Sequence, residues 1–313
     1  MTEGLLVFWI LSAACIVFCR KIYRVIIYFG VFSLITSVVY LTLGAPDVAM
    51  SEVGISAFAT IFFIVCIEKY YSRGGGLERE SVMERRSFRQ LAGQFVLPLL
   101  FTVVLCGLFM YFVPAGYVFT ELRDQYLQMF MSDVGGTNAV TAIYLGYRVY
   151  DTLFEALLLV VAVVAVTHVS WFGSEQIPDG LHSEIENSAM TKFTMRIICP
   201  IILMFGAYLI MNGHISAGGG FLGGLAFASF FICRYLVLDI YDLPIKKIMK
   251  LEELVFINIT VLPILAVFTG VFYLIADATF QHIYLIAMSA LVGMKVACAF
   301  FILFYRYIAI ERM

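Results

Sequence analysis

The segment PDVAMSEVGISAFATIFFIVCI occupies residues 46–67 and decides how the rest of the chain is interpreted. A membrane-spanning helix needs about 20 mostly apolar residues, because hydrocarbon offers the backbone no hydrogen-bond partner. The segment has that length and is apolar apart from Asp47 near its start and Glu52 one turn further on. It therefore predicts a spanning helix with a carboxylate inside the membrane.

The composition of the whole chain agrees with this prediction. The chain is 62% hydrophobic and 13% charged, with a mean hydropathy of +0.97, whereas a soluble domain is about 45–50% apolar and about 25% charged. The formal net charge is only -2, and no basic arm is present, so nucleic acid is not expected as a partner. The 7 cysteines lie in apolar runs without metal-binding spacing, which indicates packing residues.

Apolar runs of spanning length recur along the sequence and predict an all-α, polytopic integral membrane protein with about nine transmembrane helices. The first run is short and follows an acidic residue, so we expect a retained span and not a signal peptide. The nine runs cover residues 4–19, 23–43, 46–67, 95–113, 150–169, 193–211, 219–237, 255–276 and 283–307.

The basic residues predict the orientation of these helices, since cytoplasmic loops hold the excess of lysine and arginine. With the N-terminus outside and the C-terminus cytoplasmic, the inner segments hold all but three of the 20 basic residues. The exceptions are Arg123, Arg148 and Lys295. This distribution requires an odd number of spans.

Two hydrophilic segments, around residues 68–94 and 171–190, predict three modules. We expect three helices in residues 1–75, two in 90–172 and four in 190–313. Within the second module, residues 114–149 are not lipid-like, but their apolar residues recur at near-helical spacing. An amphipathic helix at the outer surface is expected there.

Ionisable residues inside a membrane are costly, at roughly 2.5–3.5 kcal/mol on insertion scales, so each indicates a partner, a water-filled cavity or a function. Glu52 lies about 8 Å beyond Asp47 along its helix, and Ser56 and Thr60 follow on the same face. We expect a polar stripe that faces a helix bundle. The alternative is a purely structural hydrogen bond from a protonated carboxylic acid.

A second group comprises Arg148, Asp151 and Glu155, whose spacing of three and four places them on one helix face. Arg148 can neutralise Asp151 near the surface, so Asp151 is either an interfacial partner or part of an ion path. Glu155 lies deeper. Glu52 and Glu155 would enter from the same outer side to similar depth and could serve one aqueous path, although a structural role remains the alternative.

Two further residues complete the candidates. Lys295 lies about 18 Å into the last run, near the midplane, and is either a relay or half of a structural ion pair with a carboxylate of this chain or a partner subunit. His214 lies in a glycine-rich joint between two runs and either titrates or forms a loop-capping hydrogen bond. No catalytic triad, P-loop or dinucleotide signature is present, so no catalytic residue, metal or cofactor is expected in this chain.

Three motifs together resemble the membrane modules of Mrp-type Na+/H+ antiporters and of membrane-bound hydrogenases. The stretch PDVA at 46–49, leading to Glu52, resembles the small C-terminal domain of the antiporter A subunit, equivalent to the hydrogenase D subunit. The stretches GGTNAV at 135–140 and RVYDTLFE at 148–155 resemble the TGGTNVV and RGFDTLGE patterns of the hydrogenase E subunit. Glu155 matches the glutamate of that family, whereas Val149 and Phe154 replace glycines.

The third motif lies between the sixth and seventh runs and resembles the antiporter B subunit, equivalent to the hydrogenase F subunit. Ser216 and Ala217 stand where that family usually has a residue followed by proline. Besides Gly213 and His214, the motif includes Gly218, Gly219, Gly220, Phe221, Gly223 and Gly224.

The resemblance implies a fused D-E-F-like subunit of a multisubunit complex in a prokaryotic cell membrane, helping to translocate Na+ or H+ without catalysing a reaction. It implies antiporter-like subunits and small C-, E-, F- and G-type subunits as partners, with lipid around them. One alternative is a structural adaptor that docks antiporter-like subunits. Another is a non-catalytic subunit of a hydrogenase or a ferredoxin- or NADH-linked oxidoreductase with a peripheral redox arm.

Overall fold

The computed structural model describes residues 2–19, 21–72, 100–108, 110–111, 120–169, 188–237, 244–268 and 278–309. The chain forms two compact units. One combines Met1–Ile67 with Met129–Met313, and the other is Glu68–Gln128. In the second unit, residues 100–108 are helical.

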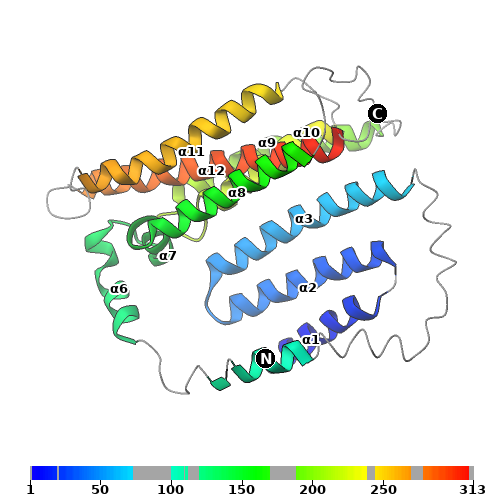
Figure 1. Cartoon of the computed structure of the whole chain (residues 1–313), viewed down its shortest axis with the longest axis horizontal. Coiled ribbons are helices and arrows are strands. Elements are labelled where there is room, and N and C mark those ends of the chain that lie inside the picture. Colours follow the sequence, from blue (N-terminus) through cyan, green and yellow to red (C-terminus); the bar gives the residue numbers. More distant parts are fainter. Residues whose placement is uncertain are drawn as a thin grey trace. The chain divides into compact units, whose positions relative to one another are not determined.

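The described residues form helices and no β-strand, which confirms the predicted all-α class. Figure 1 labels the α-helices among them along the chain. They are α1 (Thr2–Phe18), α2 (Ile22–Thr42), α3 (Pro46–Ser72), α6 (Thr120–Asp133), α7 (Ala139–Ala142), the π-helix η2 (Ile143–Tyr147), α8 (Val149–Val169), α9 (Ala189–Asn212), α10 (Gly220–Val237), α11 (Ile245–Phe268) and α12 (Ala278–Ala309).

Seven of the described helices are long and apolar enough to cross a membrane: α2, α3 and α8 to α12. The helix α1 is apolar but has 17 residues, which agrees with the short first run. The expected fourth span, 95–113, lies only partly within the described residues. The polytopic fold is therefore confirmed, while the count of nine and the orientation remain predictions.

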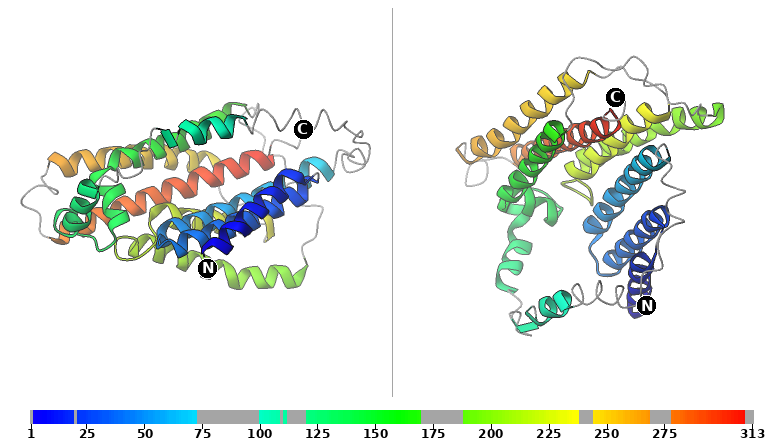
Figure 2. Two further views of the ribbon diagram at one scale, coloured as in Figure 1. Left: turned by 90° about the horizontal axis from the view of Figure 1, so that it is seen from below. Right: turned by 45° about the vertical axis from the view of Figure 1, so that its right-hand side comes forward.

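The helix α12 is the most enclosed of the candidate spans. It packs against α8, α9, α10 and α11, and Figures 1 and 2 show it among these neighbours. One buried cluster joins Val163 of α8 to Ala299 and Ile302 of α12. Another joins Ile232 of α10 to Phe304 of α12. Residues on α12 are thus held by several helices at once.

The helices α2 and α3 are joined to each other and to this bundle by specific contacts. Ser37 Oγ of α2 donates a hydrogen bond to the Ala49 carbonyl of α3, at 2.7 Å. Farther along α3, the Phe58 ring packs edge-on against Phe300 of α12, with centroids 4.8 Å apart. The carboxylates of α3 therefore lie close to the helices that carry the other candidate residues.

Close backbone approach fixes α10 against α12. A Cβ atom added to Gly220 would overlap the Ser289 carbonyl, and one added to Gly224 would overlap the Gly293 carbonyl. Small residues are the usual means by which helices approach closely in membranes. Packing thus explains Gly220 and Gly224 of the third motif.

Two local predictions were wrong in detail. The helix α11 begins at Ile245, ten residues before the expected start at 255. Its first turns contain Lys246, Lys247 and Lys250, which are exposed, so this part of the helix is absent from the apolar run. The outer segment is not one amphipathic helix but α6, α7 and η2. The break between α6 and α7 contains Gly135 at φ 81°, a conformation that favours glycine.

Candidate functional site

Glu52 lies on the side of α3 that faces α2. Its Oε1 accepts a hydrogen bond from Ser33 Oγ, and the Ser33 side chain is almost completely buried. Glu52 itself remains partly exposed. The carboxylate therefore has a fixed hydroxyl donor on one side and retains access on another.

The predicted hydroxyl stripe continues from Glu52 along α3. Ser56 is buried one turn on, and Thr60 lies against Gly30 of α2, where an added Cβ would be 3.2 Å from Thr60 Oγ1. The Thr60 hydroxyl is buried and has no hydrogen-bond partner among the described residues. The stripe spans about 12 Å along the helix, and its two ends contact α2; the sequence pattern predicted a stripe facing a helix bundle without naming the helix.

Asp47, in the first turn of α3, connects all three predicted modules. Its Oδ1 accepts hydrogen bonds from Asn138 Nδ2 at 3.1 Å and from the Gly218 backbone N–H at 3.2 Å. Charge-assisted hydrogen bonds of this kind are stronger than neutral ones. The structure thus gives Asp47 a positioning role beside its predicted place in the ion path.

Asn138 is the centre of this junction. Its Nδ2 also lies 3.1 Å from the Gly213 carbonyl and 3.0 Å from the Ser216 carbonyl. Its Oδ1 accepts the Val140 N–H and caps the start of α7. Both polar atoms of the amide form hydrogen bonds, so the asparagine of the GGTNAV stretch holds the second and third motifs together.

His214 contributes to the junction mainly through its backbone. Its carbonyl accepts the N–H groups of Thr137 and Asn138, at 2.9 and 3.0 Å. Its ring is buried and lies 5.3 Å from the His282 ring, edge to face. Burial, and secondly the nearby His282, lower the pKa of His214, so the imidazole is neutral at neutral pH.

The glycines beside His214 permit the loop to turn. Gly219 has φ 121°, a conformation that other residues rarely adopt, and its Cα faces the Tyr144 hydroxyl so closely that an added Cβ would overlap it. Burial raises the pKa of Tyr144, and the charges of Asp47 and Glu155 raise it further. Tyr144 therefore lies within electrostatic range of both carboxylates, while hydrogen bonds with Thr141 and Ser289 act in the opposite direction.

Glu155 lies on α8, just after the π-helix η2. Thr152 Oγ1 donates to the Tyr144 carbonyl at 2.6 Å and holds the start of α8 against η2; such π-turns often occur at functional sites. Thr152 and Ala156 are buried, whereas Glu155 is exposed on the neighbouring face. Among the described residues it has no hydrogen-bond or ion-pair partner.

The other two charges of this group form the predicted pair. Arg148 Nη2 and Asp151 Oδ2 are 2.6 Å apart, with side chains 60% and 56% exposed. The geometry is that of an interfacial pair at the start of a span. Exposed pairs of this kind contribute little to stability, and Glu155 is the member of the group left without neutralisation.

Lys295 is fully buried in α12, and its Nζ forms an ion pair and hydrogen bond with Glu252 Oε1 of α11. The Phe256 ring lies 5.2 Å from the same nitrogen, within the range of a cation–π contact. Glu252 is 3% exposed. Removing either member of such a buried pair is strongly destabilising, because the other charge is then buried without a partner.

Glu252 is the candidate residue that sequence reasoning missed, because it lies before residue 255, where the apolar run is expected to begin. A signal was present. Glu252, Val255 and Ile259 follow one another at spacings of three and four, and all three are buried. The buried face of α11 therefore extends back to Glu252.

The candidate residues do not form one cluster. Asp47, Asn138, His214 and Gly218 meet at the junction, whereas Lys295 pairs with Glu252 in the bundle core. Within the described chain, no hydrogen bond or ion pair joins Glu52 to Glu155. Gly223 faces Ile210 of α9, and Phe221 packs on the core cluster around α12.

The comparisons with known families match two parts of the chain. Residues 190–311 match the domain related to the MnhB subunit of Na+/H+ antiporter. Residues 7–71 match the D subunit of MBH. These parts coincide with the regions in which the first and third motifs lie.

Similar proteins and structures point in the same direction. A relative from Staphylococcus haemolyticus, named as the mnhB2 subunit of an antiporter, is 34% identical over 103 residues, which is 31% of this chain and 71% of the relative. A relative from Rhizobium meliloti, named as the A/B subunit of a K+/H+ antiporter, is 24% identical over 260 residues, covering 73% of this chain and 25% of the relative. A chain of the Mrp complex from Dietzia sp. DQ12-45-1b has the same fold, with a TM-score of 0.74 and 18% identity, over 99% of this chain and 35% of that one.

Proposed function

Because the chain belongs to the family of Mrp-type antiporter and membrane-bound hydrogenase membrane modules, as a fusion of an MbhD-like part with an MnhB-like part, we propose that it carries part of a Na+ or H+ path. The chain is a membrane subunit of an antiporter-like complex. It contributes carboxylates and contacts, and the driving reaction belongs to other subunits.

The observation that carries the proposal is the exposure of Glu155. The residue lies six positions into the α8 span, about 9 Å from its start, yet it faces away from the chain's own core. An ionised carboxylate facing hydrocarbon is costly. Glu155 is therefore proposed to face water or a cationic group supplied by an antiporter-like partner subunit.

Glu52 is proposed as the second carrier. The Ser33 hydroxyl donates a hydrogen bond to its Oε1, and the Ser56 and Thr60 hydroxyls continue inward along α3. A proton or Na+ can exchange with the carboxylate, because the Ser33 hydroxyl supplies an oxygen ligand beside it and no ion pair to Glu52 is found among the described residues. Asp47, which bonds Asn138 and Gly218, and Tyr144, whose hydroxyl lies near Gly219, are polar groups at the junction and are proposed to connect the two carboxylates.

Lys295 is proposed to respond to the exchange of a proton or Na+ at these carboxylates, and not to carry ions over long distances. Its partner Glu252 neutralises it inside the bundle, so a proton added to Glu252 would release the lysine charge. His214, neutral and close to His282, is proposed to maintain the junction. The partners are proposed to be antiporter-like and small C-, E-, F- and G-type subunits in a prokaryotic cell membrane.

The test is cation-driven proton movement in proteoliposomes that contain the assembled complex. Glu155→Gln and Glu52→Gln keep the size of the side chain but remove its titration, and each should abolish Na+- or K+-dependent proton movement while all subunits still co-purify. Glu253→Gln is the matched control, because Glu253 is an exposed glutamate of α11 outside the proposed path. It should leave transport unchanged.

A structural adaptor is the second candidate function, favoured by the enclosed Glu252–Lys295 pair and by the Asp47–Asn138 junction. Under that function, both glutamine variants would assemble normally and retain full transport. Such a result would reject the carrier role. Iron-sulfur or nickel-iron subunits in the purified complex would indicate a redox-driven complex in place of an antiporter.

A further inference from the structure

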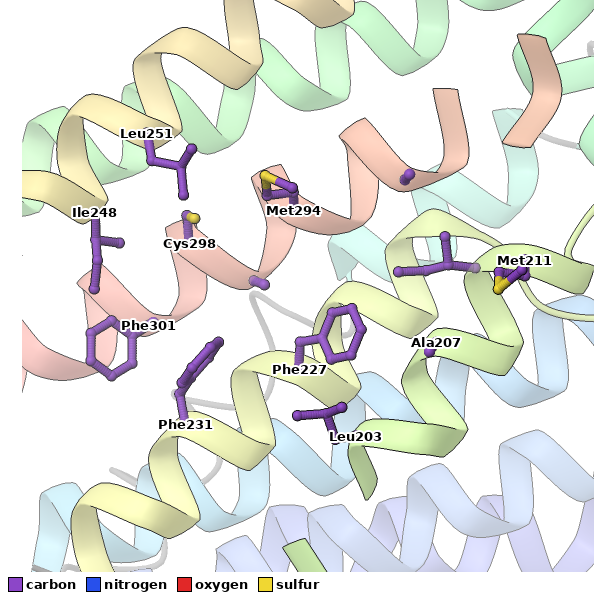
Figure 3. Close-up of a pocket in the computed structure, with 13 residues that line it drawn as sticks. Leu203, Ala207, Met211, Phe227, Phe231, Ile248, Leu251, Met294, Cys298 and Phe301 are labelled. Carbon is purple, nitrogen blue, oxygen red and sulfur yellow. The ribbon is translucent and has the colours of Figure 1, made fainter. Parts of the chain in front are cut away.

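The interior of the described bundle contains two kinds of space, one apolar and one with hydroxyl groups. The apolar space is a recess between the α9–α10 pair and the α11–α12 pair, where side chains such as Leu203 and Met294 converge (Figure 3). Its walls hold no side-chain oxygen or nitrogen. Buried hydroxyl groups are found instead on α2 and α3, at Ser33, Ser37 and Ser56. Because hard cations take oxygen ligands, only the second space suits Na+.

The two carboxylates of α3 have partners of different chemistry. Asp47 Oδ1 accepts hydrogen bonds from the Asn138 amide and from the Gly218 backbone N–H. Nitrogen donors of this kind have no lone pair to offer to a cation. Glu52 Oε1 instead accepts a hydrogen bond from Ser33 Oγ. The partners of Asp47 can therefore only donate, whereas the partner of Glu52 can adapt to a change of occupant.

A serine hydroxyl adapts in this way because its hydrogen rotates and its oxygen carries two lone pairs. In the structure, Ser33 donates to the carboxylate of Glu52. When Glu52 holds a proton, the same oxygen can accept a hydrogen bond from the carboxylic acid. When Glu52 holds a cation, the oxygen can turn a lone pair toward it. One side chain thus serves all three states without a movement of the helices.

The place of Ser33 is fixed by contacts between α2 and α3 on both sides of it. Its side chain is 1% exposed. Toward one end of the helix pair, Ser37 Oγ donates to the Ala49 carbonyl at 2.7 Å. Toward the other end, Gly30 lies against Thr60, where an added Cβ would be 3.2 Å from Thr60 Oγ1. The hydroxyl is therefore held beside the carboxylate by the packing of two helices.

The helix α1 supports the same turn of α2. Trp9 Nε1 donates to Thr36 Oγ1 at 2.8 Å, and Thr36 Oγ1 donates to the Phe32 carbonyl, also at 2.8 Å. The Trp9 ring stacks on the Phe32 ring, with centroids 5.3 Å apart. Phe32 and Thr36 flank Ser33 in the sequence. All three helices of the first module thus contribute to the position of this hydroxyl.

We infer that Ser33 is the specificity-determining residue at Glu52, an inference that rests on the exchange proposed there. Its hydroxyl oxygen is a ligand of Na+ when the cation replaces the proton on Glu52. Water supplies the remaining ligands from the exposed side of the carboxylate and takes up the proton as Na+ enters. Ser33 therefore sets how strongly Na+ competes with H+ at this carboxylate.

Na+-driven proton movement in proteoliposomes of the assembled complex tests the inference. Ser33→Ala removes the ligand and should raise the KM for Na+ about tenfold, as for the loss of one hydrogen bond to a charged group. The maximal rate should stay close to that of the wild type. Ser37→Ala is the matched control, because Ser37 is a buried serine of the same helix that bonds a backbone carbonyl. It should leave the KM unchanged.

Ser33→Cys separates the loss of the oxygen from the loss of volume. Sulfur fills the space of the hydroxyl oxygen but is a soft ligand, poorly suited to a hard cation. The KM for Na+ should therefore rise as it does in Ser33→Ala. If Ser33→Ala does not assemble, Ser33→Cys decides the question.

The outcomes separate this inference from the proposed function. An unchanged KM in Ser33→Ala or Ser33→Cys, or an equal rise in Ser37→Ala, would overturn the role of Ser33. If Glu52→Gln abolishes transport while Ser33→Ala has the KM of the wild type, the role of Ser33 alone is rejected. Full transport by Glu52→Gln would reject the exchange at Glu52 and the role of Ser33 with it.

Discussion

Two glutamates within spanning helices, Glu252 and Glu155, have opposite surroundings. Glu252 of α11 is 3% exposed and is paired with Lys295 inside the bundle, whereas Glu155 of α8 is exposed and lacks a partner in the described chain. The difference separates a charge that the fold neutralises by itself from a charge that the fold presents outward. Only the second kind requires a partner or solvent outside the part of the chain that the structure describes.

The largest expected effect comes from breaking the enclosed pair. Lys295→Met leaves Glu252 buried without a partner and should destabilise the protein by about 3–5 kcal/mol. The double variant Lys295→Met/Glu252→Leu should recover most of that loss, because apolar replacement of a buried pair is often close to neutral. Thermal unfolding in detergent measures both variants, and a double variant as unstable as the single one would contradict this interpretation.

A smaller loss is expected at the junction, which is also enclosed. Asn138→Ala removes the amide that contacts Asp47, Gly213 and Ser216 and should cost about 1.5–3 kcal/mol, as for hydrogen bonds to charged groups. Asp47→Asn keeps the size but removes the charge, and should cost less. Unfolding curves of the two variants give this order; a larger loss for Asp47→Asn would indicate that Asp47 has another partner.

The contribution of His214 to the pH dependence of stability should be smaller still. Because its pKa is lowered in the folded protein, the unfolded chain binds more protons below about pH 6.5, and stability falls as pH falls. His214→Gln should reduce the difference in unfolding temperature between pH 7.5 and pH 5.5. An unchanged difference would show that His214 is not responsible for the acid sensitivity.

The smallest effect on stability should come from the outward-facing side. Glu155→Gln removes a charge that has no partner within the described chain, so the free energy of unfolding should change by no more than about 0.5 kcal/mol. The same unfolding assay, applied beside Lys295→Met, sharpens the contrast between the two glutamates. A loss similar to that of Lys295→Met would mean that Glu155 is also neutralised internally.

Much of the fold could be predicted from the sequence, because lipid imposes a simple rule on the backbone. The runs at 46–67, 150–169 and 219–237 match α3, α8 and α10 closely, and the spacing of Arg148 and Asp151 predicted their pair. The start of α11 was not predicted. Hydropathy penalises Glu252 as a single residue, while its cost is removed by Lys295, 43 residues away in the sequence.

The site was predictable residue by residue but not in its arrangement. Glu52 and its hydroxyl stripe follow from local spacing, whereas the Ser33 donor belongs to another helix. The meeting of Asp47, Asn138 and Gly218 depends on contacts across 91 and 171 positions in the sequence. No local pattern contains such information, although the short motifs marked the residues involved.

The Asn138 junction has a consequence for how the three motifs stay together. Its contacts are individually weak, and between separate chains they would have to overcome the translational and rotational entropy of association. In one polypeptide the same contacts form at an effective concentration in the millimolar range, set by the connecting segments. Covalent continuity therefore fixes the ratio of the three parts at one to one to one, and it keeps the polar junction at Asn138 closed together with the apolar contacts between α8 and α12.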